Sequence, residues 1–194
     1  EICPTGIAQL IAAGNINGVR KTLNPHKAIC TALWGDEFSL DFAHLNPAIE
    51  LRRMCYTNNP RIIAQHDNMV AVNTALSIDL TGQVAAESFG PLMYSGVGGQ
   101  LDFTIGAMLA KNGRAVTLLP STARQGTVSR IVPLHPEGTV ISVPRTYVNY
   151  VVTEYGAVNL LGKSQRQRAE LLISIAHPDF RSDLQQAARR LFWP

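Results

Sequence analysis

The sequence has no apolar segment long enough to cross a membrane. Hydrophobic residues make up 46% of the 194 residues, but no run approaches the roughly 18 consecutive apolar residues that a spanning helix needs. A secretory signal pattern is also missing. We therefore expect a protein that acts away from membranes, in the cytoplasm.

Cysteine is scarce, and metal-binding patterns are missing. Cys3, Cys30 and Cys55 are widely spaced, no C-x-x-C pair occurs, and the five histidines form no H-E-x-x-H motif. These spacings argue against a structural zinc site, so we predict no bound metal. Free thiols are typical of a reducing compartment. Cys30, within an apolar run, is expected to be a small core residue.

Signatures of two other enzyme classes are absent. The sequence contains no G-x-S-x-G nucleophile elbow. It also contains no G-x-x-x-x-G-K-[ST] phosphate loop. These absences argue against a serine hydrolase and a P-loop nucleotidase.

The net charge of +3 comes from the C-terminal end of the chain. Residues 1–162 carry eleven basic and eleven acidic side chains, whereas residues 163–194 carry six basic and three acidic ones. A nucleic-acid surface usually shows a denser basic face with interleaved aromatics, so we predict no nucleic-acid partner and a solvated helix surface. The alternative that Arg166 or Arg168 faces the phosphates of a nucleotide-like cofactor stays open.

The hydrophobic pattern favours one α/β domain with an open, mixed sheet in three layers. Helix signals cover 7–13, 36–44 with Asp36 as the cap, 61–66, 101–109, 164–176 and 179–191. Strand signals cover 28–34, 69–78, 83–86, 115–119, 128–132, 139–143 and 148–153. The apolar runs at 28–34 and 115–119 are expected to be buried strands.

Residues 94–103 (YSGVGGQLDF) form a glycine-rich turn between a strand signal and a helix signal. Glycine allows backbone N–H groups to approach a ligand closely, and the first turn of a helix adds unpaired donors. Such a turn favours a phosphate or a developing oxyanion. It is not the dinucleotide fingerprint, because Leu101 stands where the third glycine is needed. From the residues alone, a plain strand-to-helix connection is the alternative.

This turn resembles the G-V-G-G-Q-x-D-F loop of the acetyl-CoA hydrolase/transferase family, which includes 4-hydroxybutyrate CoA-transferases. Further segments resemble the family in the same order along almost the whole chain. They are DNMVAVN at 67–73, DLTGQV at 79–84, LPSTA at 119–123, SRIVP at 129–133, VVTEYG at 151–156 and IAHPDFR at 175–181.

The resemblance implies a Rossmann-like fold of the type that CoA-transferases share with phosphosugar isomerases. Family members pair two such domains, and residues 1–194 are similar to the C-terminal catalytic domain only. An N-terminal domain of the same enzyme is therefore the first expected partner. Family members commonly form dimers, so a homodimer is also expected.

The resemblance also implies roles for five residues. Glu1 falls where the family has its nucleophilic glutamate, although the two residues that precede that glutamate are not in this chain. Gly98 and Gly99 fall on the oxyanion-stabilising positions. Asn58 corresponds to a residue that holds the nucleophile or substrate, and Glu154 to a glutamate that orients the nucleophile. Read without the family, these are a terminal carboxylate, a glycine turn, a turn residue before Pro60 and a glutamate that could bond the terminal helices.

Gly96, Gln100 and Arg124 are the expected CoA contacts. Arg124 stands where the family often has Lys-Gly, and either cation could bind CoA phosphates. Asp102 is expected to cap the following helix or brace the loop.

The resemblance implies a CoA-transferase that moves CoA between an acyl-CoA and a short-chain carboxylate through a glutamyl-CoA thioester. CoA is then a substrate, and no permanent cofactor is expected. Two alternatives remain: an acyl-CoA hydrolase of the same family, and a non-catalytic CoA-binding or oligomerisation module.

Overall fold

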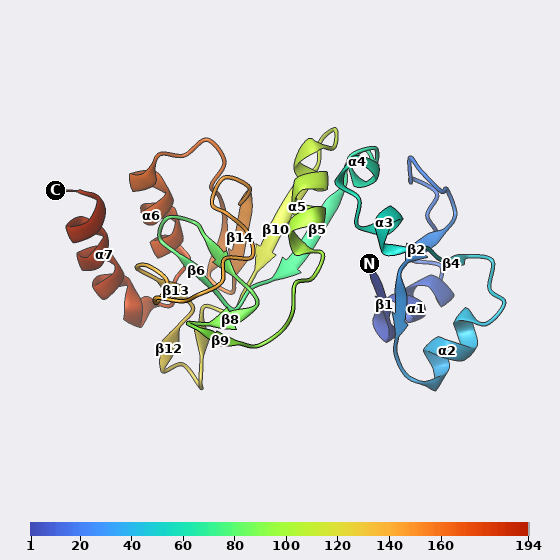
Figure 1. Ribbon diagram of the computed structural model, residues 1–194, viewed down its shortest axis with the longest axis horizontal. Helices are drawn as coiled ribbons and strands as arrows, with labels where there is room; N and C mark the ends of the chain where they lie inside the picture. The colour runs from blue at the N-terminus through green and yellow to red at the C-terminus, as the bar shows by residue number, and fades with distance from the viewer. Residues whose placement is uncertain (194) are drawn as a thin grey trace.

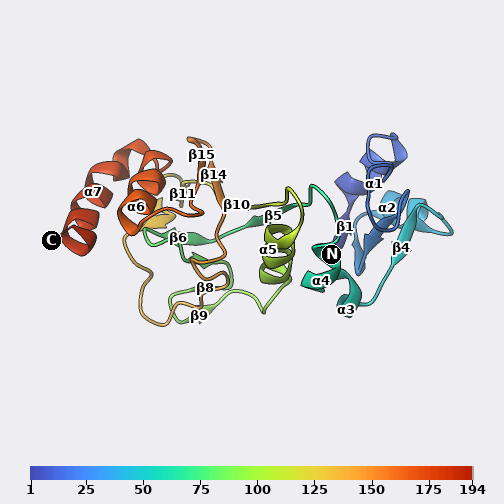
Figure 2. The ribbon, with the colours of Figure 1, turned by 90° about the horizontal axis from the view of Figure 1, so that it is seen from above.

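The computed structural model describes residues 1–193, which form an elongated molecule (Figures 1 and 2). The first four strands and two helices lie at one end, and the two C-terminal helices lie at the other. The helices are α1 Thr5–Ala12, α2 Glu37–Ala43, α3 Met54–Thr57, α4 Pro60–Ile63, α5 Gln100–Leu109, α6 Gln165–Ser174 and α7 Pro178–Phe192.

The largest sheet has four strands in the order β15-β14-β10-β5. Strands β5 (Val70–Thr74), β10 (Arg114–Leu118) and β14 (Tyr150–Thr153) are parallel, and β15 (Gly156–Asn159) returns antiparallel beside β14. The prediction of an α/β protein with an open, mixed sheet is confirmed. The carboxyl ends of the three parallel strands share one edge, which is where open α/β sheets bind ligands.

Strand alternation decides which side of this sheet α5 covers. Ala71 of β5 and Ala115 of β10 are paired in register and buried against Ala107 of α5. The alternate residues of β5, Val70 and Val72, are 49% and 59% exposed. The small alanines therefore let α5 lie close to the sheet. The apolar row formed by Val70 and Val72 is not covered by any part of residues 1–193.

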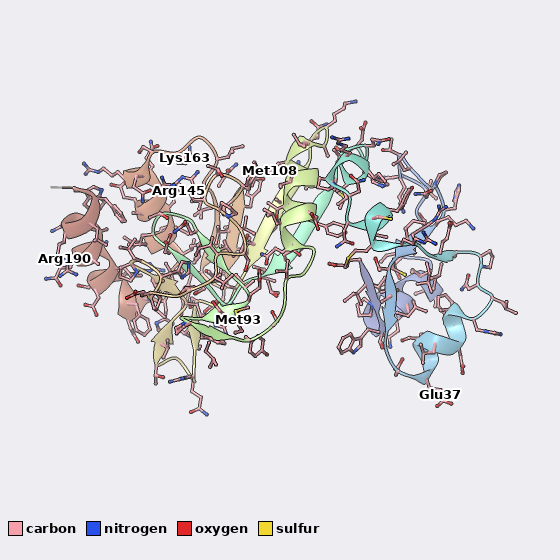
Figure 3. All side chains as sticks on the ribbon, viewed as in Figure 1. Glu37, Met93, Met108, Arg145, Lys163 and Arg190 are labelled. Atoms are coloured by element: carbon pink, nitrogen blue, oxygen red, sulfur yellow. The ribbon has the colours of Figure 1, made fainter. Side chains whose placement is uncertain are left out.

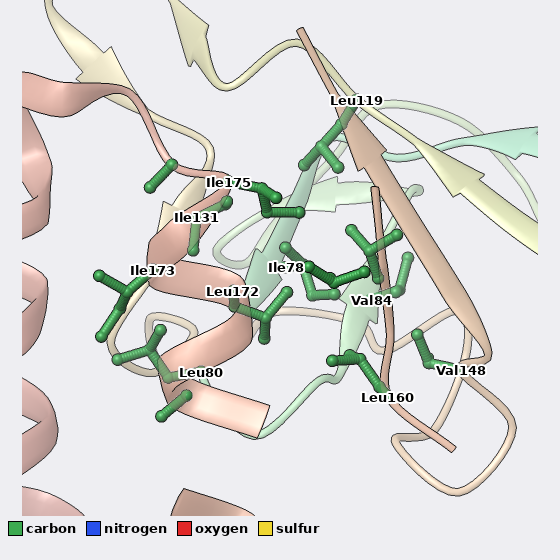
Figure 4. Packing of buried hydrophobic residues seen from close by; sticks show 14 of the residues in the cluster. Ile78, Leu80, Val84, Leu119, Ile131, Val148, Leu160, Leu172, Ile173 and Ile175 are labelled. Carbon is green, nitrogen blue, oxygen red and sulfur yellow. The ribbon is translucent and has the colours of Figure 1, made fainter. Parts of the chain in front are cut away.

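The main core lies between the sheet, the C-terminal helices and a second small sheet. That sheet joins β13 (Ile131–Val132), β6 (Ser77–Asp79) and β7 (Val84–Ala85). Figure 4 shows Leu172 of α6 beside Ile78 and Val84, and all three are fully buried. Complete burial of such side chains contributes about 1.5–3 kcal/mol each.

Local signals fix the ends of several helices. The side chain of Asp36 accepts a hydrogen bond from Ser39 N and caps α2, as predicted. Ser164 and Gln167 form a capping box at the start of α6. Pro178 occupies the first turn of α7, where its missing N–H costs nothing.

The single buried strand predicted over 28–34 is wrong. A bend at Thr31 divides this run into two strands. The first, β2 (Ala28–Cys30), pairs with β4 (Ile49–Leu51). The second, β3 (Ala32–Trp34), pairs with β1 (Ile2–Pro4). Cys30 is buried as expected, but Trp34 is 75% exposed. An apolar run does not reveal that its two halves pair with different neighbours.

Other predicted strands also divide or disappear. The 69–78 run divides into β5 and β6, and the 128–132 run divides into β12 (Val128–Ser129) and β13. The 139–143 run forms only one isolated bridge, from Val143 to Val84. The remaining strands, none of them predicted as a separate element, are β8 Ser88–Phe89, β9 Leu92–Met93, β11 Thr122–Ala123 and the hairpin partner β15.

The C-terminal basic residues lie at the α6 and α7 end of the molecule. Figure 3 shows Lys163 and Arg190 at that end and Glu37 at the other. Arg168 donates to the backbone oxygens of Lys163 and Arg145, and Arg166 pairs with Glu170 across one helical turn. Both arginines therefore have local protein partners. None of the helices within residues 1–193 is long and apolar enough to span a membrane.

Gly106 tests the contact between α4 and α5. A Cβ added there would lie 2.5 Å from the Cβ of Ile63, so Gly106→Ala is expected to destabilise the fold by about 1–3 kcal/mol. The measurement is urea unfolding. In the control Gly6→Ala, on α1, the added Cβ has nothing within 4 Å, so a gain of roughly 0.5–1 kcal/mol is expected. A gain at both positions would show that α5 is not packed this tightly.

Candidate active site

Glu1 is fixed by the small N-terminal sheet. Its backbone oxygen accepts a hydrogen bond of 2.6 Å from Thr31 N, just before β1 pairs with β3. In its side chain, Oε1 accepts a hydrogen bond of 2.8 Å from Asn58 Nδ2. Oε2 accepts no hydrogen bond from residues 1–193. One carboxylate oxygen is therefore held and the other is free.

Asn58 lies between the short helices α3 and α4 and is buried. Its own N–H bonds to the oxygen of Met54, which closes α3. Thr57 Oγ1 donates to Asn58 Oδ1 at 2.8 Å, so the amide must direct Nδ2 toward Glu1. Thr57 Oγ1 also contacts Thr31 Oγ1, from the bend between β2 and β3. A hydrogen bond of this kind to a charged group contributes about 1.5–3 kcal/mol.

Gly99 is the N-cap of α5 and touches the same carboxylate. A Cβ added at Gly99 would lie 2.7 and 2.8 Å from the two carboxylate oxygens of Glu1 and would collide with Asn58 Nδ2. Its φ of −81° is ordinary, so glycine is required here by contact and not by backbone conformation. A Cβ at Gly98 would meet nothing within 4 Å.

The backbone near Gly99 offers free hydrogen-bond donors. The N–H groups of Gly98, Gly99 and Gln100 have no acceptor among the residues that the structure describes. The first turn of a helix carries the positive end of its dipole, which stabilises nearby negative charge by about 0.3–1 kcal/mol. The arrangement thus favours an oxyanion that develops beside Glu1.

Glu1 lies where two cavities meet. The smaller, of about 450 Å³, is lined by the glycine turn and by Asn73 and Thr74 at the carboxyl end of β5. The larger, of about 1260 Å³, is lined by Arg20, Lys21 and His66 among others. Burial lowers the pKa of Lys21 and also that of His66, which the charge of Lys21 lowers further.

The predicted site residues are only partly brought together. Glu1, Asn58 and Gly99 are in contact, and Gly98 lines the smaller cavity with Glu1. Gly96 and Gln100, the predicted CoA contacts of the glycine turn, line this cavity too.

Glu154 lies elsewhere. It occupies the two-residue turn between β14 and β15, where its carboxylate accepts hydrogen bonds from the N–H and hydroxyl of Ser121. It lines neither cavity that Glu1 lines. Desolvation raises the pKa of Glu154. The hydrogen bonds from Ser121 and the nearby His177 together lower it by more, so the pKa lies below its usual value. The structure therefore pairs Glu154 with Ser121 and not with Glu1.

Arg124 lies away from both cavities, and Asp102 does not cap α5. Arg124 lies in the turn between β11 and β12 with a left-handed φ of 49°, and it lines neither cavity. Asp102 lies in the first turn of α5 but makes no capping hydrogen bond, because Gly99 is the N-cap. The cap predicted for Asp102 is wrong.

One protein family matches most of the chain. The model of the acetyl-CoA hydrolase/transferase C-terminal domain matches residues 35–188. The chain belongs to the acetyl-CoA hydrolase/transferase family. Residues 1–34, with Glu1, lie outside this match, although single relatives match up to 99% of the chain.

Two family members with assigned activities resemble nearly the whole chain. A 4-hydroxybutyrate coenzyme A transferase of Clostridium kluyveri is 46% identical over 99% of the chain and 45% of its own length. A succinyl-CoA:cyclohexane-1-carboxylate CoA transferase of Geobacter metallireducens is 42% identical over 98% of the chain and 44% of its own length. The chain thus spans less than half the length of these curated relatives.

Solved structures of the family agree with the fold. RipA from Yersinia pestis superposes with a TM-score of 0.93 at 43% identity, over 98% of this chain and 43% of that one. A 4-hydroxybutyrate CoA-transferase from Porphyromonas gingivalis gives 0.82 at 41% identity, over 99% of this chain and 44% of that one.

The sequence analysis did not single out Glu87. This residue lines the smaller cavity together with Glu1. Glu87 is only 8% exposed. The available signal was a glutamate directly after the apolar residues 84–86, seven residues ahead of the glycine turn. No group of three or more His, Cys, Asp or Glu side chains within residues 1–193 is arranged to hold a metal ion.

Asp102 tests the electrostatics of this site. Burial and the negative charge of Glu1 raise the pKa of Asp102 above its usual 3.8. The stability that neutral Asp102 contributes is present below pH 3.8 and is lost as the pH rises through the folded-state pKa. Asp102→Asn is therefore expected to raise the Tm at pH 7 by about 2 °C.

The measurement is thermal unfolding at pH 7 and pH 3, with Asp183→Asn on the exposed side of α7 as the control. The gain should vanish at pH 3 and be absent in the control. An equal gain at both pH values would contradict the electrostatic explanation.

Proposed function

We propose that this chain is the C-terminal catalytic domain of a CoA-transferase, which moves CoA between an acyl-CoA and a short-chain carboxylate. The observation that carries the proposal is the contact of the Glu1 carboxylate with Asn58 and Gly99 at the start of α5. A carboxylate at this position is a nucleophile with donors beside it for the oxyanion that its attack creates.

The first half-reaction begins at the free oxygen of Glu1. Oε2 attacks the thioester carbonyl of the acyl-CoA, the carbonyl oxygen becomes an oxyanion, and collapse expels the CoA thiolate and leaves a mixed anhydride. The thiolate then attacks the Glu1 carbonyl of the anhydride. The donor carboxylate leaves, and Glu1 carries CoA as a thioester.

The second half-reaction reverses these steps with another acid. The acceptor carboxylate attacks the glutamyl-CoA thioester and expels the thiolate, which then attacks the acyl carbonyl of the new anhydride. The new acyl-CoA leaves and Glu1 regains its carboxylate. Each step forms one bond to carbonyl carbon and breaks one, so no redox partner or metal is needed for the balance.

Asn58 and the glycine turn have separate roles in this scheme. Asn58 holds Oε1 so that Oε2 faces the cavity, and Thr57 keeps its amide oriented. The N–H groups of Gly98 and Gly99 donate to the oxyanion. Loss of one such donor typically costs about 3 kcal/mol in the transition state.

The two cavities suggest where the substrates lie. CoA carries phosphates, and the larger cavity contains Arg20, Lys21 and His66, so we assign CoA to it. The smaller cavity has no Lys, Arg or His in its lining and is assigned to the acyl group. This assignment moves Gly96 and Gln100 from the CoA side to the acyl side.

The names of the relatives support a transferase with an organic-acid acceptor. Besides those above, a butyryl-CoA:acetate CoA-transferase of Anaerostipes caccae is 37% identical over 98% of this chain. A hydrolase is the second candidate, because an acetyl-CoA hydrolase of Candida albicans is 30% identical over 70% of the chain. The two activities differ in whether water reaches the acylated glutamate.

We further propose that the working enzyme contains an N-terminal domain and forms a homodimer. Support for a further domain comes from the relatives, of which this chain spans less than half, and from the exposed apolar row of Val70 and Val72. Apolar sheet surface of this kind ordinarily packs against another layer.

Replacing the nucleophile tests the proposed function. Glu1→Gln should lower the exchange of labelled acetate into acetyl-CoA by at least about 10⁴-fold, because an amide cannot attack the thioester. The wild-type protein mixed with acetyl-CoA should gain a CoA adduct on Glu1 by mass spectrometry, and borohydride should reduce this thioester to an alcohol and release the CoA. Glu37→Gln, on α2, is the matched control and should exchange normally. Net thioester loss without any exchange would instead identify a hydrolase.

The glycine turn gives a second test. Gly99→Ala places a methyl group against both oxygens of Glu1 and is expected to lower exchange at least about 100-fold. Gly98→Ala keeps the N–H and its Cβ meets open space, so its loss should stay below about tenfold. Equal losses in the two variants, compared by steady-state exchange rates, would mean that the contact with Glu1 does not matter.

A further inference from the structure

Thr31 is connected to Glu1 by two separate routes. Its backbone N donates a hydrogen bond of 2.6 Å to the backbone oxygen of Glu1. Its hydroxyl lies 2.5 Å from Thr57 Oγ1, which donates to Asn58 Oδ1 at 2.8 Å, and Asn58 Nδ2 donates to Glu1 Oε1 at 2.8 Å. These four residues form a closed hydrogen-bond ring, which holds both the main chain and the carboxylate of Glu1.

The carboxylate decides the direction of the side-chain hydrogen bonds in this ring. An ionised carboxylate only accepts, so Asn58 presents Nδ2 to Glu1 and Oδ1 to Thr57. The amide oxygen also only accepts, so the single hydroxyl proton of Thr57 goes to Asn58. The contact between the two hydroxyls then takes its proton from Thr31.

Thr31 has no competing partner for that proton among residues 1–193. The contact with Thr57 is the one hydrogen bond that its hydroxyl makes to this part of the chain. Thr31 also lines neither of the two cavities that meet at Glu1, so a substrate in either cavity leaves this hydroxyl in place. The side chain of Thr31 therefore reaches the site only through Thr57.

The centre of the ring is shielded from water. Thr57 and Asn58 are each 8% exposed, so solvent is a poor replacement for the Thr31 hydroxyl. A buried hydroxyl that accepts a hydrogen bond becomes a stronger donor, because each bond of a chain polarises the next. The proton that Thr31 gives to Thr57 therefore strengthens the two bonds that follow and end on the carboxylate.

The ring also joins two segments that are separated in the sequence. Thr31 lies in the bend between β2 and β3, whereas Thr57 and Asn58 lie at the end of α3. Loss of the contact between the two hydroxyls keeps the bond from Asn58 to the carboxylate. It releases α3, however, from the bend that binds the main chain of Glu1.

We propose that Thr31 is a positioning residue for the nucleophile. Its N–H holds the main chain of Glu1, and its hydroxyl orients the carboxylate through the ring without touching either substrate. This inference rests on the proposed function, because it takes Glu1 as the group that attacks the thioester. It differs from a purely structural role in one respect: the hydroxyl of Thr31 affects the rate only while Asn58 is present.

Removal of this hydroxyl from the full-length enzyme is the first test. Thr31→Val keeps the branched shape and should lower the exchange of labelled acetate into acetyl-CoA by about threefold to tenfold, which corresponds to the loss of one hydrogen bond. Thr31→Ser keeps the hydroxyl and should exchange at close to the wild-type rate. Because Thr31 lies outside both cavities, the Kd of free CoA, measured by calorimetry, should not change in either variant.

Thr153→Val is the matched control for lost stability. Thr153 is also buried, and its hydroxyl donates to the backbone oxygen of Ile175 at 2.6 Å, but it lines neither cavity. This variant should lower the Tm at least as much as Thr31→Val and leave exchange unchanged at a temperature where both are folded. Equal losses of exchange in the two variants would overturn the inference.

A double-mutant cycle decides whether Thr31 acts through Asn58. In Asn58→Ala the ring no longer ends on the carboxylate, so the addition of Thr31→Val should cause no further loss of exchange. Losses that multiply would overturn the inference. A Thr31→Ser variant that exchanges as poorly as Thr31→Val would overturn it too.

Thermal unfolding separates this inference from the proposed function. Thr31→Val and Thr57→Val remove the same contact between hydroxyls, so the Tm shift of the double variant should be smaller than the sum of the single shifts. A wild-type enzyme that exchanges no acetate, with Tm shifts that combine in this way, would contradict the transferase and support the ring. Normal exchange in both the wild type and Thr31→Val, with Tm shifts that add, would do the reverse.

Discussion

The site depends on the close contact between the carboxylate of Glu1 and a glycine that has no side chain to keep it away. The added Cβ at Gly99 would lie 2.7 Å from a carboxylate oxygen of Glu1. Any other residue at 99 would therefore push Glu1 away from the helix start. The absence of one methyl group is what brings a nucleophile, an amide donor and free backbone N–H groups into one small volume.

This contact joins three segments that are far apart in the sequence. Glu1 comes with the N-terminal sheet, Asn58 with the α3 and α4 helices, and Gly99 with the helix that covers the main sheet. The packing of Gly106 against Ile63 sets the approach of α4 to α5, and Thr31 and Thr57 connect the N-terminal sheet to Asn58. The site is thus built on packed helices and strand ends, which hold a geometry more closely than loops do.

Local signals predicted the parts of the fold that local physics decides. Asp36 caps α2 as expected, and the two predicted C-terminal helices form as α6 and α7. Strand ends were predicted less well, because pairing partners are chosen by tertiary structure. The apolar run through Thr31 divides between two sheets, and nothing in its composition marks the division.

The same limit applies to the site. The family motifs predicted Glu1, Asn58 and Gly99, which the structure brings into contact. They also suggested Glu154, which the turn between β14 and β15 instead presents to Ser121. Glu87 escaped notice because its place in the lining of the smaller cavity is a property of the folded chain.

A crystal structure of the full-length enzyme trapped with acyl-CoA tests the central claim most directly. We predict continuous electron density from Glu1 to the sulfur of CoA, with the thioester oxygen within about 3.2 Å of the N–H of Gly98 or Gly99. Ordered CoA beside an unmodified Glu1, with its sulfur directed to another residue, would contradict the account.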